Sequence, residues 1–155
     1  MSPKTAFDAD VLIYAAAKDH PLGIRVAALF ADAAAGEAVG VGSVLLLTEV
    51  LAKPMRDDPE SGECAALVSL LSRLELQPFD APTARVSLAF AVSYGLRAAD
   101  AAHLATAVAA GADRFLTNNR RDFPQSIAEI DIVYPEELPS AESSASQVEP
   151  SDLPK

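Results

Sequence analysis

The sequence contains a single cysteine, Cys64, and only two histidines among its 155 residues. One cysteine cannot form an internal disulfide, and its scarcity is typical of a protein from a reducing compartment. One cysteine and two distant histidines also argue against an ordinary zinc site, which uses nitrogen and sulfur ligands. No serine or cysteine lies in a recognisable nucleophile motif. These absences leave chemistry based on oxygen ligands.

No stretch of the sequence reaches the roughly 20 apolar residues that a membrane-spanning helix needs. The first ten residues carry Lys4, Asp8 and Asp10 in place of a long apolar run, so we expect a cytoplasmic protein with no membrane segment. Basic residues are scarce as well: 12 stand against 22 acidic residues, which gives a formal net charge of −10. That balance argues against a general nucleic-acid binder. Divalent cations would reverse the local field at a carboxylate pocket, so affinity for phosphates should depend on metal.

Segments of strand and helix pattern alternate along the chain, which is half hydrophobic. The expected strands are short and apolar and lack strict polar alternation, which predicts an α/β fold with three layers, α/β/α, around a central, mainly parallel sheet. The expected strands are residues 5–7, 38–41, 74–78, 114–117 and 130–133. The expected helices are residues 11–17, 21–35, 44–51, 63–73, 81–94 and 99–110, with Ser43 capping the third and Pro54 stopping it.

The length of the chain suits one domain, which we place at residues 1–138. After Leu138 the composition shifts to serine, glutamate, proline and glutamine, with almost nothing to bury. We therefore expect residues 139–155 to be a flexible acidic tail.

Four carboxylate residues lie at the end of a predicted strand or within predicted helices. Asp8 follows an apolar strand and Asp10 opens the next helix, while Glu49 lies within an apolar helix and Asp100 begins another. Parallel sheets form their sites beyond the carboxyl ends of the strands, where Asp8 and also Asn119 are expected. A partly buried carboxylate costs several kcal/mol unless a partner or a cation compensates it.

Each of these residues also has a structural explanation. Asp10 is well placed to be a helix N-cap, Asp100 suits the first turn of a helix, and Glu49 could belong to a buried ion pair. His103 falls near Asp100 on the helix surface, and we interpret it as a packed histidine, hydrogen-bonded to backbone or a carboxylate, before a metal ligand or base.

Three spaced carboxylates, Asp8, Glu49 and Asp100, suit Mg²⁺ or Mn²⁺, hard cations that prefer oxygen ligands. Such an ion can activate water for attack on phosphorus and stabilise the negative charge that develops on the phosphate oxygens. Without an ion, carboxylates brought together would repel one another.

Four motifs, in this order, resemble those of the PIN-domain family, and most closely the VapC-type toxins of toxin–antitoxin systems. The resemblance covers roughly residues 4 to 136. The motifs are Phe7–Tyr14, Leu47–Leu51, Leu96–Ala105 and Gly111–Phe123.

This resemblance implies a Mg²⁺- or Mn²⁺-dependent endoribonuclease that cuts RNA, is neutralised by a cognate antitoxin and often forms homodimers. It also implies that Asp8, Glu49 and Asp100 are metal ligands. The full set of site residues that it indicates is Asp8, Glu49, Asp100, Asn119 and Asp122.

The chain departs from the family pattern at two positions. The family usually has a small polar residue where Asp10 stands, and often an aspartate where Asn119 stands, with Asp122 one turn later as a possible substitute. Asp10 is expected to add a carboxylate to the site, whereas Asn119 indicates a weaker second metal site or lowered activity. Flanking arginines are candidates for contacts with RNA phosphates, although surface arginines more often only keep a protein soluble: Arg97, Arg120 and Arg121.

The sequence leaves two alternative functions open. The Asp8-x-Asp10 pattern after a strand also suits a haloacid-dehalogenase-like phosphatase, but Val11 and Leu12 stand where that family has glycine and threonine. The other alternative is a non-catalytic PIN-like module that binds RNA or a protein, and Asn119 is the residue that suggests it.

Overall fold

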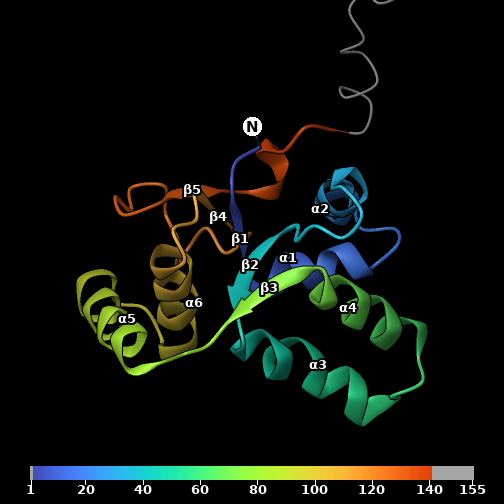
Figure 1. Cartoon of the computed structure of the whole chain (residues 1–155), viewed down its shortest axis with the longest axis horizontal. Helices are drawn as coiled ribbons and strands as arrows, with labels where there is room; N and C mark the ends of the chain where they lie inside the picture. Colours follow the sequence, from blue (N-terminus) through green and yellow to red (C-terminus); the bar gives the residue numbers. More distant parts are fainter. Residues whose placement is uncertain (1, 141–155) are drawn as a thin grey trace, which may run out of the picture.

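The structure, a computed structural model, describes residues 2–140. Its centre is a sheet with the strand order β3-β2-β1-β4-β5, in which all neighbouring strands are parallel (Figure 1). The strands are β1 (Thr5–Phe7), β2 (Gly40–Ser43), β3 (Leu74–Gln77), β4 (Arg114–Leu116) and β5 (Asp131–Val133). The predicted parallel sheet is thereby confirmed.

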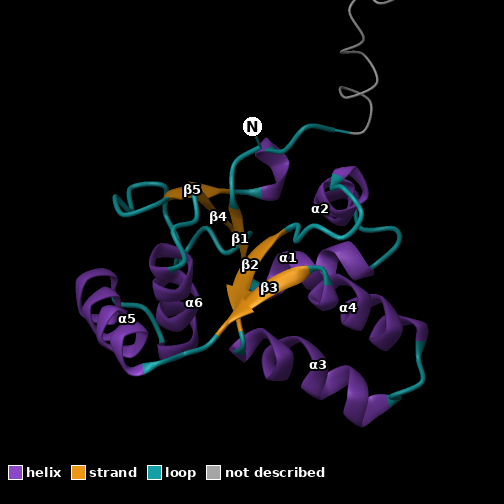
Figure 2. Ribbon diagram, in the orientation of Figure 1, coloured by secondary structure: helices purple, strands orange, loops and turns teal. Residues whose placement is uncertain are grey.

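Helices cover both faces of the sheet, with α5 and α6 on one side and α1 to α4 on the other (Figure 2). Successive strand residues point to opposite faces. Ala6 and Phe115 accordingly pack in the core under α5 and α6, while Phe7 and Leu116 pack in the core under the other helices. The three-layer α/β/α prediction is confirmed. The helices are α1 (Ala9–Ala16), α2 (Pro21–Asp32), α3 (Leu45–Asp57), α4 (Gly62–Ser72), α5 (Ala81–Tyr94), α6 (Ala98–Ala109) and the short 3₁₀ helix η1 (Pro135–Glu137).

The ends of α5 follow directly from the sequence. Asp80 caps its start, because its carboxylate accepts hydrogen bonds from the backbone N–H of Thr83 at 3.0 Å and from the Thr83 hydroxyl at 2.6 Å. Gly95 ends it in the left-handed conformation, with φ 65°. Local residue chemistry was therefore enough to predict this helix from Ala81 to Tyr94.

The prediction that Pro54 stops α3 was wrong, because the helix continues to Asp57. Proline removes one helical hydrogen bond, which disfavours it inside a helix. Here Val50 and Leu51 are buried in the core, and the N–H of Asp58 donates to the Pro54 carbonyl at 2.9 Å. Packing before the proline and the bond after it hold the last turn together.

The second strand lies two residues later than predicted, at Gly40–Ser43. It is fixed by its parallel pairing with β3, which runs from Gly40 opposite Leu74 to Ser43 opposite Gln77. Ser43 is thus a strand residue, yet its hydroxyl still accepts a hydrogen bond from the N–H of Leu45 at 3.1 Å. The expected capping contact exists, although Val44 is the residue at the helix boundary.

The predicted acidic tail, residues 139–155, lies outside the described residues from position 141 onward. Among the described residues, no helix has the length and apolar character that crossing a membrane requires.

Candidate active site

The carboxyl edge of the sheet brings the end of β1 beside the end of β4. Phe7 pairs with Leu116, and the N–H of Asp8 donates to the Leu116 carbonyl at 3.0 Å. The next residues along the two strands, Asp8 and Thr117, are therefore neighbours although they are 109 positions apart in the sequence. This edge is where open α/β sheets place their sites.

Asp8 is buried at this edge, with 5% of its surface exposed. One carboxylate oxygen accepts from the N–H of Ala9 at 2.8 Å, which makes Asp8 the N-cap of α1. The other accepts from the Thr117 hydroxyl at 2.8 Å. Burial raises the pKa of Asp8 above its ordinary value, while the charge of His103 and these two hydrogen bonds oppose the rise. The carboxylate is held in place but costly to ionise.

Glu49 reaches the same region from α3 and contacts His103 of α6. The Glu49 carboxylate bonds to Nε2 of His103, and its side chain is 38% exposed while that of His103 is 1% exposed. The hydrogen bond with His103 lowers the pKa of Glu49. Burial lowers the pKa of His103, but the contact with Glu49 and the charge of Asp8 outweigh it, so that this pKa is raised. The interpretation of His103 as a packed histidine bonded to a carboxylate is confirmed.

Asp100 lies in the first turn of α6, as predicted. Burial raises its pKa, and the charges of Asp8, Asp122 and Glu49 raise it further. Electrostatic interaction of this kind requires proximity, so the fold gathers the three predicted ligands Asp8, Glu49 and Asp100 from distant parts of the sequence.

Asp10 lies in the first turn of α1, and the suggestion that it is the N-cap was wrong, since Asp8 caps the helix. One of its carboxylate oxygens accepts from the N–H of Asn118 at 3.0 Å, and the other is buried without a partner within residues 2–140. Burial and the nearby charge of Asp8 raise the pKa of Asp10 to about 7. A fourth carboxyl group therefore belongs to this region.

Asn119 and Asp122 bond to each other in the loop after β4. The Asn119 side-chain amide donates to the Asp122 carboxylate at 2.9 Å, and the N–H of Asp122 donates back to the Asn119 carbonyl oxygen at 3.2 Å. The N–H of Asn119 also donates to the Thr117 hydroxyl at 3.1 Å. The charge of Asp122 contributes to the raised pKa of Asp100. Asn119 and Asp122 therefore lie beside the group formed by Asp8, Glu49 and Asp100.

The carboxylates at this edge are of the chemical type that binds a divalent cation, but in this structure they do not surround one point. Within residues 2–140, no three acidic, histidine or cysteine side chains converge closely enough to hold an ion as they stand. Asp8 is held by Ala9 and Thr117, and Glu49 by His103. Within residues 2–140 one Asp10 oxygen is buried without a partner, and burial together with the charges of neighbouring carboxyl groups raises the pKa of Asp10 and of Asp100. Both observations fit a divalent cation as the missing partner.

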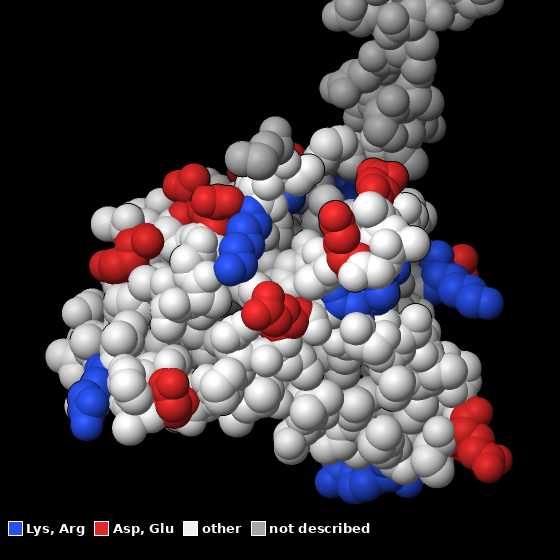
Figure 3. Space-filling model, in the orientation of Figure 1, with Lys and Arg blue, Asp and Glu red and all other residues white. Residues whose placement is uncertain are grey.

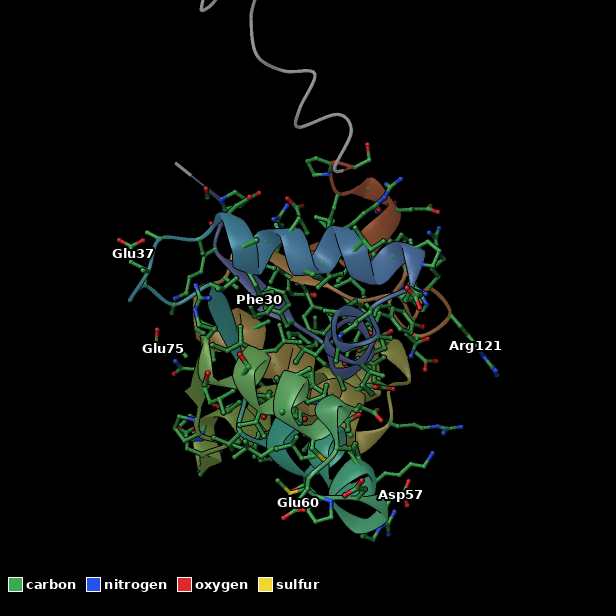
Figure 4. All side chains as sticks on the ribbon, turned by 90° about the vertical axis from the view of Figure 1, so that its right-hand side faces the viewer. Phe30, Glu37, Asp57, Glu60, Glu75 and Arg121 are labelled. Atoms are coloured by element: carbon green, nitrogen blue, oxygen red, sulfur yellow. The ribbon has the colours of Figure 1, made fainter. Side chains whose placement is uncertain are left out.

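The sequence reasoning missed Thr117, which joins Asp8 to the loop that carries Asn119. Its position as the last residue of the predicted strand 114–117 was the available signal. The flanking arginines behave differently from one another. Arg120 pairs with Glu136 at 2.5 Å and stacks over the Tyr134 ring at 4.3 Å, whereas the Arg121 side chain extends away from the ribbon (Figure 4).

Charged side chains on the face in Figure 3 are scattered, and its lysines and arginines form no continuous basic patch. This agrees with the acidic composition of the chain. On that face, nothing marks a broad surface for binding the phosphate backbone.

A parallel α/β/α fold with a cluster of acidic side chains at the carboxyl edge of its sheet defines the class of protein. The chain belongs to the PIN domain family, whose family model matches residues 6–128. No match was found among curated proteins.

Solved structures of similar fold include toxin–antitoxin proteins. A toxin–antitoxin complex from Klebsiella pneumoniae has a chain 22% identical, with a TM-score of 0.64, over 85% of this chain and 97% of that one. VapBC2 from Rickettsia felis, bound to a promoter DNA fragment, is 18% identical with a TM-score of 0.64, over 84% and 97%. FitAB bound to an IR36 DNA fragment is 18% identical with a TM-score of 0.66, over 88% and 99%. At these identities the similarity establishes the fold.

Proposed function

We propose that the protein is a metal-dependent endoribonuclease and the toxin of a toxin–antitoxin pair, which hydrolyses RNA phosphodiester bonds with Mg²⁺ or Mn²⁺. One observation carries this proposal: Asp8, Glu49 and Asp100 come from three distant elements, and their charges act on one another at the carboxyl edge of the sheet. Membership of the PIN domain family supports it, since PIN domains of toxins are generally nucleases that use divalent ions.

Asp8, Glu49 and Asp100 are the residues that would hold the ion. When bound, a divalent ion supplies activation of water and stabilisation of negative charge on phosphate oxygens. The protein's own part is to position the carboxylates. Thr117 orients Asp8 through its hydroxyl, and His103 holds Glu49 between α3 and α6.

Asn119 and Asp122 contribute at the border of the site. Their mutual hydrogen bonds fix the loop after β4 beside Thr117. Arg97 and Arg121 are exposed near these motifs and are the better candidates for phosphate contacts, since Arg120 is already paired with Glu136.

The partners that we propose are a cognate antitoxin and a second copy of the chain. The similar structures from Klebsiella pneumoniae and Rickettsia felis are those of toxin–antitoxin assemblies. A negatively charged nuclease site is also one that a partner protein can cover with basic side chains.

A non-catalytic PIN-like module is the second candidate, and one contact favours it. The Asn119 amide carries no charge and is bound to Asp122, so this position adds no carboxylate to the site. The phosphatase alternative loses its support, because the family model that matches the chain is that of the PIN domain.

The test is cleavage of a mixed RNA pool by the purified protein with Mg²⁺ or Mn²⁺, with EDTA as the metal-free condition. Asp100→Asn is the sharper variant, because replacing Asp8 would also change its hydrogen bonds with Ala9 and Thr117. Asp57→Asn, at the exposed end of α3, is the matched control.

We expect metal-dependent cleavage by the wild type and Asp57→Asn, and loss of cleavage in Asp100→Asn with an unchanged circular dichroism spectrum. Cleavage that survives in EDTA would overturn the proposed metal dependence, and cleavage that survives in Asp100→Asn would overturn the proposed site. Metal binding without cleavage in the antitoxin-free protein would favour the binding module.

A further inference from the structure

Asp10 has a carboxylate oxygen that the described part of the chain does not satisfy. Its Oδ2 accepts a hydrogen bond from the N–H of Asn118 at 3.0 Å, whereas Oδ1 is buried and has no hydrogen-bond partner in residues 2–140. Leaving a buried acceptor unpaired is unfavourable, and more so when the group is charged. A buried oxygen with no partner among the described residues calls for an additional one, such as water or an ion.

The charges around Asp10 indicate which kind of partner it needs. Asp8 and Asp100 both act on its carboxyl group with negative charge. The side-chain ion pairs that the structure has within residues 2–140 join His103 to Glu49 and Arg120 to Glu136, so no basic side chain of that region forms an ion pair with Asp10. A cation is therefore the partner that this oxygen lacks.

The position of Asp10 is fixed by the same loop that fixes Asp8. The N–H of Asn118 holds Asp10, and the hydroxyl of Thr117 holds Asp8, so consecutive loop residues set both carboxylates. Asp122 also accepts a hydrogen bond through one oxygen, from the Asn119 amide at 2.9 Å, but within residues 2–140 it has no buried oxygen without a partner, and in this it differs from Asp10.

We propose that Asp10 is a further ligand of the divalent cation, through Oδ1, beside Asp8 and Asp100, and that Asp122 is not. The proposal rests on the proposed function, because it assumes the ion held by Asp8, Glu49 and Asp100. The first turn of α1 then supplies the carboxylate that Asn119 does not.

The test is calorimetric titration of the full chain with Mn²⁺ alone, which requires no RNA and no catalysis. The variants are Asp10→Asn, Asp122→Asn and Asp100→Asn, with Asp57→Asn as the exposed control. An asparagine at position 10 keeps an oxygen that can accept from the N–H of Asn118, so this variant removes the charge and retains the tether. Circular dichroism and metal-free thermal unfolding check the fold of each variant.

We expect Asp10→Asn to weaken Mn²⁺ binding by about tenfold or more, the order of loss typical of supporting groups at metal sites, with Asp122→Asn close to the wild type. The double variant Asp10→Asn/Asn119→Asp should regain affinity, because it returns a carboxylate to the adjoining loop.

Three outcomes separate the proposals. Unchanged Mn²⁺ affinity in Asp10→Asn, with loss in Asp100→Asn, overturns the role of Asp10 and leaves the proposed function standing. Loss in Asp122→Asn without loss in Asp10→Asn makes Asp122 the additional ligand and overturns the proposal. Unchanged affinity in both Asp10→Asn and Asp100→Asn overturns the metal site itself, and the role of Asp10 with it.

Discussion

Thr117 shows how one uncharged residue organises the acidic group. Its side chain is fully buried, donates to Asp8 at 2.8 Å and accepts from the N–H of Asn119 at 3.1 Å. The Asp8 carboxylate and the Asn119 N–H are polar groups near the core, where losing a hydrogen bond costs more free energy than forming one contributes. The hydroxyl therefore matters more than the size of the side chain.

Thr117→Val keeps the shape of the residue and removes both hydrogen bonds. We expect it to lower the free energy of unfolding by about 1–3 kcal/mol, because an Asp8 oxygen and the Asn119 N–H lose their partner. Urea denaturation measures the change, with Thr48→Val on the exposed face of α3 as the control. Equal losses in the two variants would mean that the Thr117 hydroxyl has no special role.

Asp10 makes the stability of the metal-free protein depend on pH. Because burial and the nearby charge of Asp8 raise its pKa to about 7 in the folded state, the folded chain keeps a proton that the unfolded chain loses at lower pH. Its contribution to stability is present in acid, falls as the pH rises from the ordinary aspartate range, and is lost above pH 7.

Asp10→Asn should therefore unfold at a higher urea concentration than the wild type at pH 8, with the difference shrinking towards pH 4. The measurement is a series of urea midpoints in EDTA across this range. A difference that stays constant with pH would show that Asp10 does not titrate in this window.

At the scale of elements, the close packing of α1 against α2 helps to hold the carboxyl edge of the sheet in place. Gly23 of α2 lies against the backbone of α1, where a Cβ atom would stand 2.0 Å from the carbonyl oxygen of Tyr14. His20 caps α2 through its ring nitrogen and stacks on Tyr14, so the two helices are joined at one corner. This contact holds α1, which follows its cap Asp8, on the sheet.

Gly23→Ala should force these helices apart and lower the free energy of unfolding by about 1–3 kcal/mol, as overpacking usually does. Gly62→Ala, at the first residue of α4, is the matched control, since nothing lies within 4 Å of its added Cβ. Thermal unfolding compares the two. A Gly23→Ala protein as stable as the control would show that α1 and α2 can shift without cost.

At the scale of the whole molecule, the net charge of −10 opposes binding of the RNA substrate that we propose. A polyanion is repelled by an acidic protein unless cations neutralise the surface that it meets. The carboxyl edge gathers Asp8, Asp10, Glu49 and Asp100, and a divalent ion bound there would change the local field.

RNA affinity should consequently depend on divalent ions beyond simple screening. We expect fluorescence anisotropy of a labelled RNA to show binding about tenfold tighter in Ca²⁺, which accepts oxygen ligands, than in sodium chloride of equal ionic strength. Asp100→Asn should lose this difference. Equal affinity in both salts would place the RNA on another surface.

The local pattern of the sequence determined much of this protein. It predicted the alternation of strands and helices, the parallel sheet and both ends of α5, because caps, breakers and apolar periodicity act between near neighbours. That Asp8, Glu49 and Asp100 hold a metal ion stays a prediction. The PIN-domain resemblance added the order of the motifs, which the family model supports over residues 6–128.

Only the tertiary structure decided the continuation of α3 past Pro54, the strand boundaries at Gly40 and Ser43, and the pairing of Asp8 with Thr117. It also showed that Asp10 has a buried oxygen without a partner in the described residues, and that Asp8 caps α1. Each of these depends on strand register or packing between residues distant in sequence, and a local pattern carries no information about which distant groups will meet.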